Sequence, residues 1–442
     1  MNRAFKYVVV GVSSILVALI LAGSLVGQSQ PVSEDPAAPY RHLSVYAEVF
    51  AKIKSDYVEE PDMKNVTLGA INGLLISIDP FASYLNSDQY KQYTKAKELK
   101  RAAVGLVLSR KYGYEINVVD AILGSPADKA GISTGDIVES INGIQTRDMP
   151  LAFADLLLEG DPGTTIDLTV LRLRKPDPVT IKLTRAEIKS PPIVVRMADN
   201  QTGLVQVYDL SAGTTAQVAA AVKEIEKRGA KRLVLDLRRD GVSADREGIA
   251  LANLFLGTGT IATLQGQTMP KQSFEADPAK VIFSGPMVVL TNRGTLGAAE
   301  IAAAALVDNK RAQVVGERTF GDAAVRKIIR TEDGGAVLLA VAKYYSPLGK
   351  AIQDNPVVPE FLVNDIEGQP LEEEDLETEE QTTPARKPGE DPVLKKALDV
   401  LNVAAPVTAA RSAGQAVVAP VPAAPSPDLV KEQADPGKKK LP

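Results

Sequence analysis

Gly294-Thr295-Leu296-Gly297-Ala298-Ala299-Glu300 is the stretch of the sequence that decides the fold. Just before it, Met287 to Thr291 form an apolar run that is typical of a buried strand. After the turn, Ala298 to Leu306 form an alanine-rich run that is typical of a helix. A strand that leads through a glycine-containing turn into a helix favours an α/β architecture.

The same order of strand and helix recurs upstream. Gly203 to Val207 and Leu233 to Arg238 read as strands, and helical patterns from Thr214 to Arg228 and from Arg246 to Phe255 follow them. This repetition predicts a layered α/β core with a largely parallel sheet over residues 189–363.

Shorter strands separated by turn residues precede this core, over residues 101–188. A strand opens at Val104, a turn follows at Gly124-Ser125-Pro126-Ala127, and a helix from Leu151 to Leu158 ends at Gly160. This succession resembles a PDZ domain, and we call residues 101–188 the PDZ module. Such a domain binds a peptide by strand addition beside its helix, while N–H groups of a loop capture the terminal carboxylate.

The resemblance implies a peptide-binding groove in the PDZ module. A glycine at position 105 would let the backbone approach the carboxylate, because it has no Cβ. The groove is expected to comprise Val104, Gly105, Leu106, Val107, Leu151 and Ala154. For any one of these residues the alternative is that its side chain belongs to the ordinary core.

Two stretches of the core resemble the carboxyl-terminal processing serine peptidases. That family writes the stretch around Gly294 as G-[ST]-A-S-A-S-E, and it writes T-F-G-K where this chain has Thr319-Phe320-Gly321-Asp322. Tyr344 to Gln353 is similar to the family's Y-Y-T-P-S-G-R-x-I-Q, and Ile78 to Tyr84 loosely matches its L-D-P-x-S-x-Y. The resemblance implies a multidomain α/β fold: a helical N-terminal region at 35–100, the PDZ domain and a crotonase-like α/β peptidase core.

The chain departs from this family at the residues that carry the chemistry. In the family the serine attacks the peptide carbonyl and a desolvated lysine removes the hydroxyl proton. Gly297 stands at the serine position, Asp322 at the lysine position, and Arg326 at the position of a glutamine that orients the lysine in some relatives. The turn D-L-R-N-N-P-G-G, whose glycines help form the oxyanion hole, reads Asp236-Leu237-Arg238-Arg239-Asp240-Gly241-Val242-Ser243. The sequence therefore predicts a site with no intact catalytic residue.

Other groups could replace the lost pair. The only histidine is His42, in the N-terminal region, so a serine–histidine–aspartate triad would need a long reach. A relocated pair of Ser243 and Lys327 is a second possibility. Asp322 could form an acid pair with Glu300, or an ion pair with Arg326 that holds the emptied site closed. We expect no metal or other cofactor, since histidine and cysteine ligands are missing at suitable spacing.

The first residues of the chain predict export. Arg3 and Lys6 precede an uncharged apolar run from Val8 to Gly27, so residues 1–34 read as a signal peptide or a signal anchor. The sequence contains no cysteine, which excludes a lipid-modified start and any disulfide. We expect a bacterial envelope protein, anchored in the inner membrane and facing the periplasm or extracytoplasmic side, or secreted after cleavage of the segment.

The segments on either side of the predicted PDZ module and core show simpler sequence patterns. Residues 35–100 read as helices, a region that in relatives also helps to form dimers. From 364 to 442, acidic runs and alanine- and proline-rich segments predict a mostly disordered tail with one short helix near 391–401.

Three functions remain open on the sequence alone. The first is a pseudopeptidase that binds C-terminal segments of envelope proteins. A second is an active serine-type tail-specific endopeptidase that uses relocated residues, and a third is a regulatory subunit, either a homodimer or paired with an active paralogue. The net charge of −5 excludes a broad basic surface for nucleic acid.

Overall fold

The structure is a computed structural model that describes residues 38–98, 102–110, 115–147, 149–172, 175–241, 244–364 and 391–403. The predicted signal segment, 1–34, lies outside these residues, as does the chain between 365 and 390 and beyond 403. None of the helices in the described ranges is long and apolar enough to cross a membrane.

The centre of the molecule is a six-stranded sheet in the order β17-β14-β13-β10-β9-β8. Its strands are β8 (Val194–Met197), β9 (Thr202–Gln206), β10 (Arg232–Asp236), β13 (Met287–Thr291), β14 (Gln313–Gly316) and β17 (Phe361–Leu362). All neighbours pair in parallel except β8, which runs antiparallel to β9. The predicted largely parallel core sheet is confirmed. Strand β17, at the end of the predicted core range, pairs with β14.

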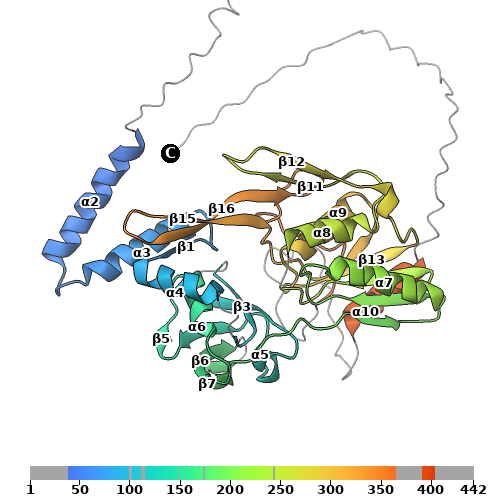
Figure 1. The fold of residues 1–442 in the computed structure, drawn as a ribbon, viewed down its shortest axis with the longest axis horizontal. Helices are drawn as coiled ribbons and strands as arrows, with labels where there is room; N and C mark the ends of the chain where they lie inside the picture. The colour runs from blue at the N-terminus through green and yellow to red at the C-terminus, as the bar shows by residue number, and fades with distance from the viewer. Residues whose placement is uncertain are drawn as a thin grey trace, which may run out of the picture.

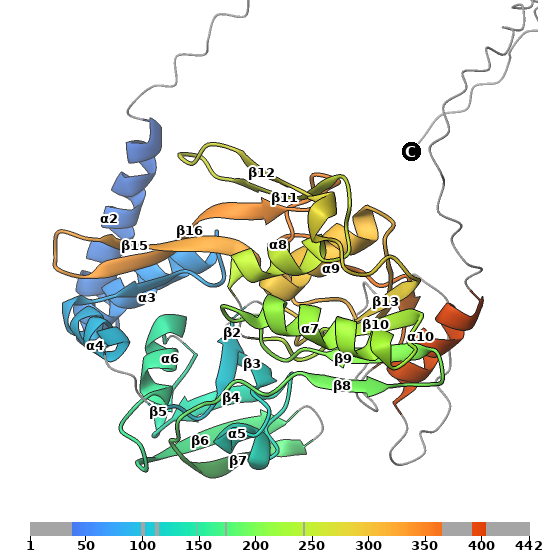
Figure 2. The ribbon, with the colours of Figure 1, turned by 45° about the vertical axis from the view of Figure 1, so that its right-hand side comes forward.

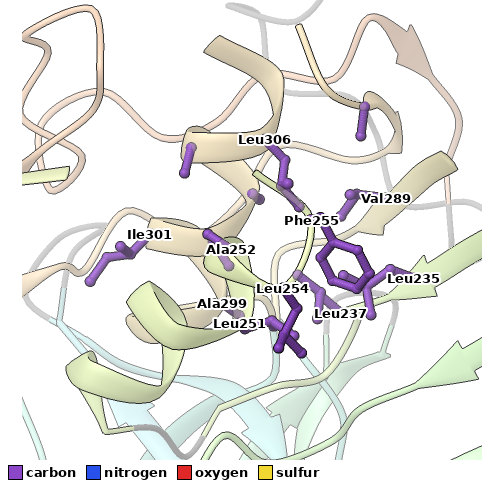
Figure 3. Packing of buried hydrophobic residues seen from close by; sticks show 14 of the residues in the cluster. Leu235, Leu237, Leu251, Ala252, Leu254, Phe255, Val289, Ala299, Ile301 and Leu306 are labelled. Atoms are coloured by element: carbon purple, nitrogen blue, oxygen red, sulfur yellow. The ribbon is translucent and has the colours of Figure 1, made fainter. Parts of the chain in front are cut away.

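Helices cover both faces of this sheet. On one face lie α7 (Thr214–Lys227), α8 (Asp245–Asn253) and α9 (Ala298–Asp308), and on the other lies α10 (Pro392–Val403). The alternation of side chains along β10 explains both layers: Leu233 and Leu235 pack under α7 to α9, whereas Val234 packs under α10. Figure 3 shows the first of these cores, where Phe255, Leu237 and Val289 meet between helices and sheet.

The PDZ module forms a second sheet below the core in Figure 1, in the order β2-β3-β4-β6-β7 with β5 beside β4. Its elements are β2 (Leu106–Ser109), β3 (Ile116–Ala121), α5 (Pro126–Lys129), β4 (Ile137–Ile141), β5 (Ile144–Gln145), α6 (Leu151–Leu158), β6 (Thr165–Arg172) and β7 (Lys175–Thr184). Strand β2 is at an edge of this sheet. The hydrophobic core of the module also contains Phe81 and Phe320 from outside it.

A five-stranded antiparallel sheet joins the N-terminal region to the core, as Figure 2 shows. It contains β1 (Ser83–Leu85), β11 (Thr260–Gln265), β12 (Gln272–Glu275), β15 (Ala324–Arg330) and β16 (Ala336–Tyr345), and the 3₁₀ helix η1 (Pro278–Lys280) follows β12. The N-terminal helices are α2 (Ala38–Asp56), α3 (Met63–Ile76) and α4 (Ser87–Glu98). The prediction of helices alone over 35–100 is therefore incomplete, because β1 pairs with β16.

A buried ion-pair network fixes α10 to the core. The guanidinium of Arg238 donates to both carboxylate oxygens of Asp236, at 2.9 and 2.7 Å, and to Asp391 at 2.8 Å. Asp391 also accepts a hydrogen bond from the Leu394 N–H at 2.9 Å, at the start of α10. The helix that was predicted near 391–401 is α10. Arg238, which follows β10, links the start of this helix to the sheet.

Candidate active site

The candidate site lies where β13 leads into α9. Asn292 accepts hydrogen bonds from the N–H groups of Gly294 and Arg239, at 3.0 and 3.2 Å, so the turn is bonded to the neighbouring loop after β10. Thr295 adds a second bond to that loop by donating to the Leu237 carbonyl at 2.8 Å. The turn is therefore rigidly placed at the carboxyl edge of the parallel sheet.

Gly297 begins α9 in a conformation that L side chains avoid. Its φ is 61° and its ψ is −117°. In α/β-hydrolases, a sharp, strained turn between a strand and a helix presents the nucleophile. Here the turn is kept, but Gly297 has no side chain with which to attack a carbonyl.

Glu300 joins the two altered positions. Its carboxylate is fully buried, and Oε2 accepts hydrogen bonds from the N–H groups of Gly297 at 3.1 Å and Asp322 at 2.8 Å. Oε1 accepts from the Gly321 N–H at 2.6 Å and from the Thr319 hydroxyl. These four hydrogen bonds connect the turn at Gly297 to the turn at 319–322. They also occupy both oxygens of Glu300, which are therefore not available to a substrate or a metal ion.

Burial raises the pKa of Glu300 to about 7, although the Asp322 N–H, the Thr319 hydroxyl and the Gly321 N–H act to lower it. Because this pKa is higher in the folded state, the folded chain binds the proton more tightly than the unfolded chain. The resulting stabilisation is fully present below pH 4.5 and is lost as the pH rises through 7.

We predict that Glu300→Gln removes this pH dependence. Between pH 4.5 and 7, the free energy of unfolding of the wild type should fall by about 3 kcal/mol relative to that of the variant. Urea unfolding at a series of pH values measures the difference. The exposed Glu226→Gln on α7 is the control, and a wild-type-to-variant difference that stays constant with pH would show that Glu300 does not titrate in this range.

Asp322 and Arg326 form the predicted ion pair, which the structure confirms. Arg326 Nη2 donates to Asp322 Oδ1, and Nη1 lies 3.3 Å from Oδ2. The guanidinium also lies over the ring of Phe81, with its carbon 4.5 Å from the ring centre. A carboxylate is a weaker base than a neutral amine, and Arg326 contacts both of its oxygens, so Asp322 does not offer the free base that a neutral lysine would.

A cavity of about 230 Å³ lies beside this ion pair. It is bounded by α4, α6 and β16 together with the pair itself; its lining includes Phe81, Lys97, Leu151, Asp322 and Arg326. The cavity lies between the helix of the PDZ module and Asp322, and none of the residues that line it is a serine, cysteine or histidine.

The described residues offer no lysine base for the substitute pairs that the sequence left open. Lys327 is exposed on β15, and among the residues whose burial the structure describes no lysine is buried. A lysine base must be desolvated to be neutral at pH 7, so this part of the chain offers none. Ser243 lies outside the described residues, and His42 lies on α2, away from α9 in Figure 1. The described residues contain no cluster of acidic or histidine side chains that could hold a metal ion.

The altered turn after β10 faces the PDZ module. Arg239 adopts a φ of 62°, which is unusual for a residue with a side chain, and its guanidinium extends to Asp120 and Asp128. Asp240 is fully buried, and neither of its carboxylate oxygens has a hydrogen-bond partner among the described residues. Burial raises the pKa of Asp240 well above its ordinary value, and Asp209 adds to the effect, so the protonated form of this carboxyl group is favoured.

The six residues predicted to form the peptide groove lie together at the junction of β2 and α6, but most are buried. Val104 and Ala154 have no exposed surface, and Leu151 is 8% exposed. Only Leu106 and Val107 are partly exposed. Gly105 has a φ of 80°, and a Cβ there would lie 2.3 Å from Cβ of Ser125. The need for glycine at this position is therefore already explained by Ser125, without a ligand.

Phe81, Arg239 and Asp120 are site residues that sequence reasoning missed. Phe81 sits in the loosely matched N-terminal motif, and Arg239 was noted only as a departure from the family turn. Arg239 could have been found only by recognising that this arginine of the core forms ion pairs with Asp120 and Asp128 of the PDZ module. One sequence without its structure does not show such a pairing.

Comparisons with known proteins agree with this geometry. Residues 201–363 match the model of peptidase family S41, and residues 118–172 match a PDZ domain. A carboxy-terminal-processing protease of Bartonella bacilliformis is 30% identical over 361 residues, which cover 80% of this chain and 82% of that protein. The carboxy-terminal processing protease CtpA of Bacillus subtilis is also 30% identical, over 81% of this chain and 77% of its own. The solved photosystem II D1 C-terminal processing protease superposes with a TM-score of 0.60 at 25% identity, covering 73% of this chain and 92% of its own.

Proposed function

The chain belongs to the carboxyl-terminal processing proteases of peptidase family S41, and from that premise we propose that it is a pseudopeptidase that captures C-terminal peptide segments without cleaving them. We assign Gly297 and Asp322 to the two reacting positions of the family, and the observation that supports the proposal is the ion pair that Asp322 forms with Arg326. The described residues of the PDZ module beside this site form a sheet and the helix α6. Loss of the chemistry with retention of the binding module supports a role in binding.

The partners that we propose are C-terminal segments of proteins in the bacterial envelope. The apolar run from Val8 to Gly27 supports export, with the segment either retained as an inner-membrane anchor or removed by cleavage. Cell fractionation tests this part of the proposal, because an anchored chain stays with the membranes and a cleaved one does not.

A regulatory role through pairing with a second chain is the second candidate. Its support is α2, which extends away from the body of the molecule in Figures 1 and 2. Leu43, Tyr46 and Val49 are 56%, 47% and 52% exposed. Most helical stability in proteins comes from packing of an apolar face, so we propose that α2 packs against a second copy or an active paralogue. Sedimentation of the full chain distinguishes a monomer from a dimer.

Peptide capture is tested by fluorescence anisotropy. The probe is a labelled decapeptide that ends in leucine-alanine-alanine, with either a free carboxylate or an amide at its C-terminus, and the protein is the full chain in detergent. We expect the free acid to bind at least about tenfold more tightly than the amide, because hydrogen bonds to a charged carboxylate are worth about 1.5–3 kcal/mol.

Two matched variants locate the binding. Leu106→Glu places a charge on the partly exposed edge strand β2 and should abolish binding. Ile144→Glu changes an equally apolar residue that is 49% exposed on β5 of the same module and should leave binding unchanged. Equal affinity for acid and amide, or equal loss in both variants, would contradict capture of a C-terminus in this groove.

A further inference from the structure

A groove of about 780 Å³ lies where the PDZ module leads into the core. Its walls are α5 with the turn before it, the end of β7, and the connector 186–192, which runs from β7 toward β8 in Figure 2. We call it the connector groove. The described residues that line it include none of the six predicted for the peptide groove, and neither Gly297 nor Asp322. The connector groove is therefore a separate candidate binding surface, and its volume is in the range of cavities that hold ligands.

The connector is bonded to both domains. Ala186 exchanges two backbone hydrogen bonds with Ala103 of the PDZ module, each of 2.9 Å. Near the other end, the Ser190 hydroxyl donates to Asp209 of the core. This wall is therefore held in place before anything binds, so a ligand does not have to order it, and the entropic cost of binding is reduced.

The lining of the connector groove combines apolar surface with positive charge. Apolar side chains line it from all three walls: Leu123, Pro126, Leu183, Ile188 and Pro191. Each wall also contributes one exposed lysine: Lys129 on α5, Lys182 on β7 and Lys189 in the connector. Among the described residues of the lining, Glu187 is the single acid. The connector groove therefore suits an extended ligand that carries apolar groups and several negative charges.

The three ammonium groups are available to such a ligand. Lys182 lies 3.7 Å from Asp167, but the two side chains are 68% and 52% exposed, and an ion pair so exposed contributes little. Within the part of the chain that the structure describes, neither Lys129 nor Lys189 forms an ion pair. Three positive charges around one groove repel one another, and an anionic ligand would relieve this repulsion.

The chain itself contains a segment of complementary character. Residues 371–381 read Leu-Glu-Glu-Glu-Asp-Leu-Glu-Thr-Glu-Glu-Gln, with seven acidic residues, two leucines and no basic residue. We call them the acidic segment. It lies outside the described residues, in the stretch that joins β17 to α10.

The topology of the core brings the acidic segment within reach of the connector groove. The chain leaves β17 at the carboxyl ends of the parallel strands and returns there at Asp391, beside the loop after β10. The connector reaches the same side of the sheet, because β8 starts opposite Gln206, the last residue of β9. From β17 to β8 the six strands span about 24 Å. An extended chain from residue 364 to residue 375 reaches up to about 36 Å, which exceeds this width.

We propose that the acidic segment docks in the connector groove of the same chain. Its leucines contact the apolar lining, and its carboxylates pair with Lys129, Lys182 and Lys189. The proposal is independent of peptide capture, because the two grooves share no described residue and the acidic segment has no free C-terminus. Exposed charges are screened by salt, so docking should weaken as the ionic strength rises.

A disulfide test in the full chain locates the acidic segment. The chain has no cysteine, so Thr378→Cys in the segment and Thr184→Cys, an exposed position in the connector groove, provide the two thiols. We expect mild oxidation at low salt to form an intramolecular disulfide, measured by mass spectrometry of the digested protein. In the control, the exposed Glu226→Cys near the end of α7 replaces Thr184→Cys, and we expect at least about tenfold less disulfide, because the end of α7 lies away from the carboxyl ends of the strands.

The charges are tested in the same assay. A variant with Lys129, Lys182 and Lys189 all replaced by glutamine should reduce the disulfide yield about tenfold, because three exposed ion pairs are lost together. Salt at about 1 M, where the screening length falls to about 3 Å, should act in the same way on the unsubstituted lysines. A matched variant with glutamine at the exposed Lys223, Lys227 and Lys231 should leave the yield unchanged.

Three results would overturn the proposal. The first is an equal yield with Thr184→Cys and with Glu226→Cys, and the second is a yield that the groove lysines do not affect. The third is a disulfide between two chains in place of the intramolecular one, which would assign the acidic segment to the groove of a second copy. Circular dichroism of each variant shows that a lower yield does not reflect a loss of fold. Peptide capture is measured separately and does not depend on any of these results.

Discussion

Replacing Gly248 with alanine is expected to lower the free energy of unfolding by about 3 kcal/mol or more, the cost of overpacking a core that cannot relax. Gly248 lies in α8, where a Cβ would stand 2.1 Å from the carbonyl oxygen of Ala298 and 2.8 Å from its Cα. These atoms are backbone at the first turn of α9, so they can yield only if the helix that begins at Gly297 moves. The substitution should therefore disturb the site as well as the stability.

Gly73→Ala provides the matched control. Gly73 lies within α3, and a Cβ there would have no atom within 4 Å. Alanine in place of a helical glycine then stabilises by about 0.5–1 kcal/mol. Urea unfolding followed by circular dichroism compares the two variants, and equal effects would show that α8 and α9 do not pack as closely as the structure places them.

The layered core could be predicted from the sequence because its signals are local. Leu233, Val234 and Leu235 form a continuous apolar run, which is what a strand buried on both faces requires. The helices on either side carry their own periodicity. The interpretation of Gly297 and Asp322 as substituted catalytic positions stays a prediction from the sequence, because it rests on the resemblance of the surrounding motif to the family.

What could not be predicted depends on contacts between residues distant in the sequence. The strand at Ser83–Leu85 exists because β16, far along the chain, offers it an edge. Arg239 acquires its meaning only from Asp120, which lies on another domain. The groove shows the same limit: apolar residues such as Val104 suit a pocket or a core equally well, and only packing shows that Val104 is buried.

The second large effect that we predict is the absence of peptidase turnover in the wild type. Removal of the nucleophile alone typically reduces turnover by about a million-fold, and the remainder depends on stabilisation of the oxyanion. Here the nucleophile position holds Gly297, the base position holds the paired Asp322, and the turn that would support the oxyanion hole contains Arg239 and the buried Asp240. Each change acts on the same reaction step, so none compensates for another.

Gly297→Ser together with Asp322→Lys is the informative counterpart. The strained backbone at 297 and the hydrogen bonds of Glu300 to the two turns are both present, and Arg326 beside position 322 would lower the pKa of an introduced lysine by like-charge repulsion. We expect this double variant to recover weak cleavage, limited by the altered oxyanion turn. Circular dichroism of the variant shows whether a failure to cleave reflects a failure to fold.

The most direct measurement is cleavage of an unfolded protein with an apolar C-terminal tail by the purified full chain, followed by mass spectrometry of the products. We predict that the wild type cleaves no faster than buffer, while the folded double variant produces fragments. Cleavage by the wild type that follows the chain through successive purification steps would contradict the pseudopeptidase assignment and would place a working nucleophile elsewhere in the chain.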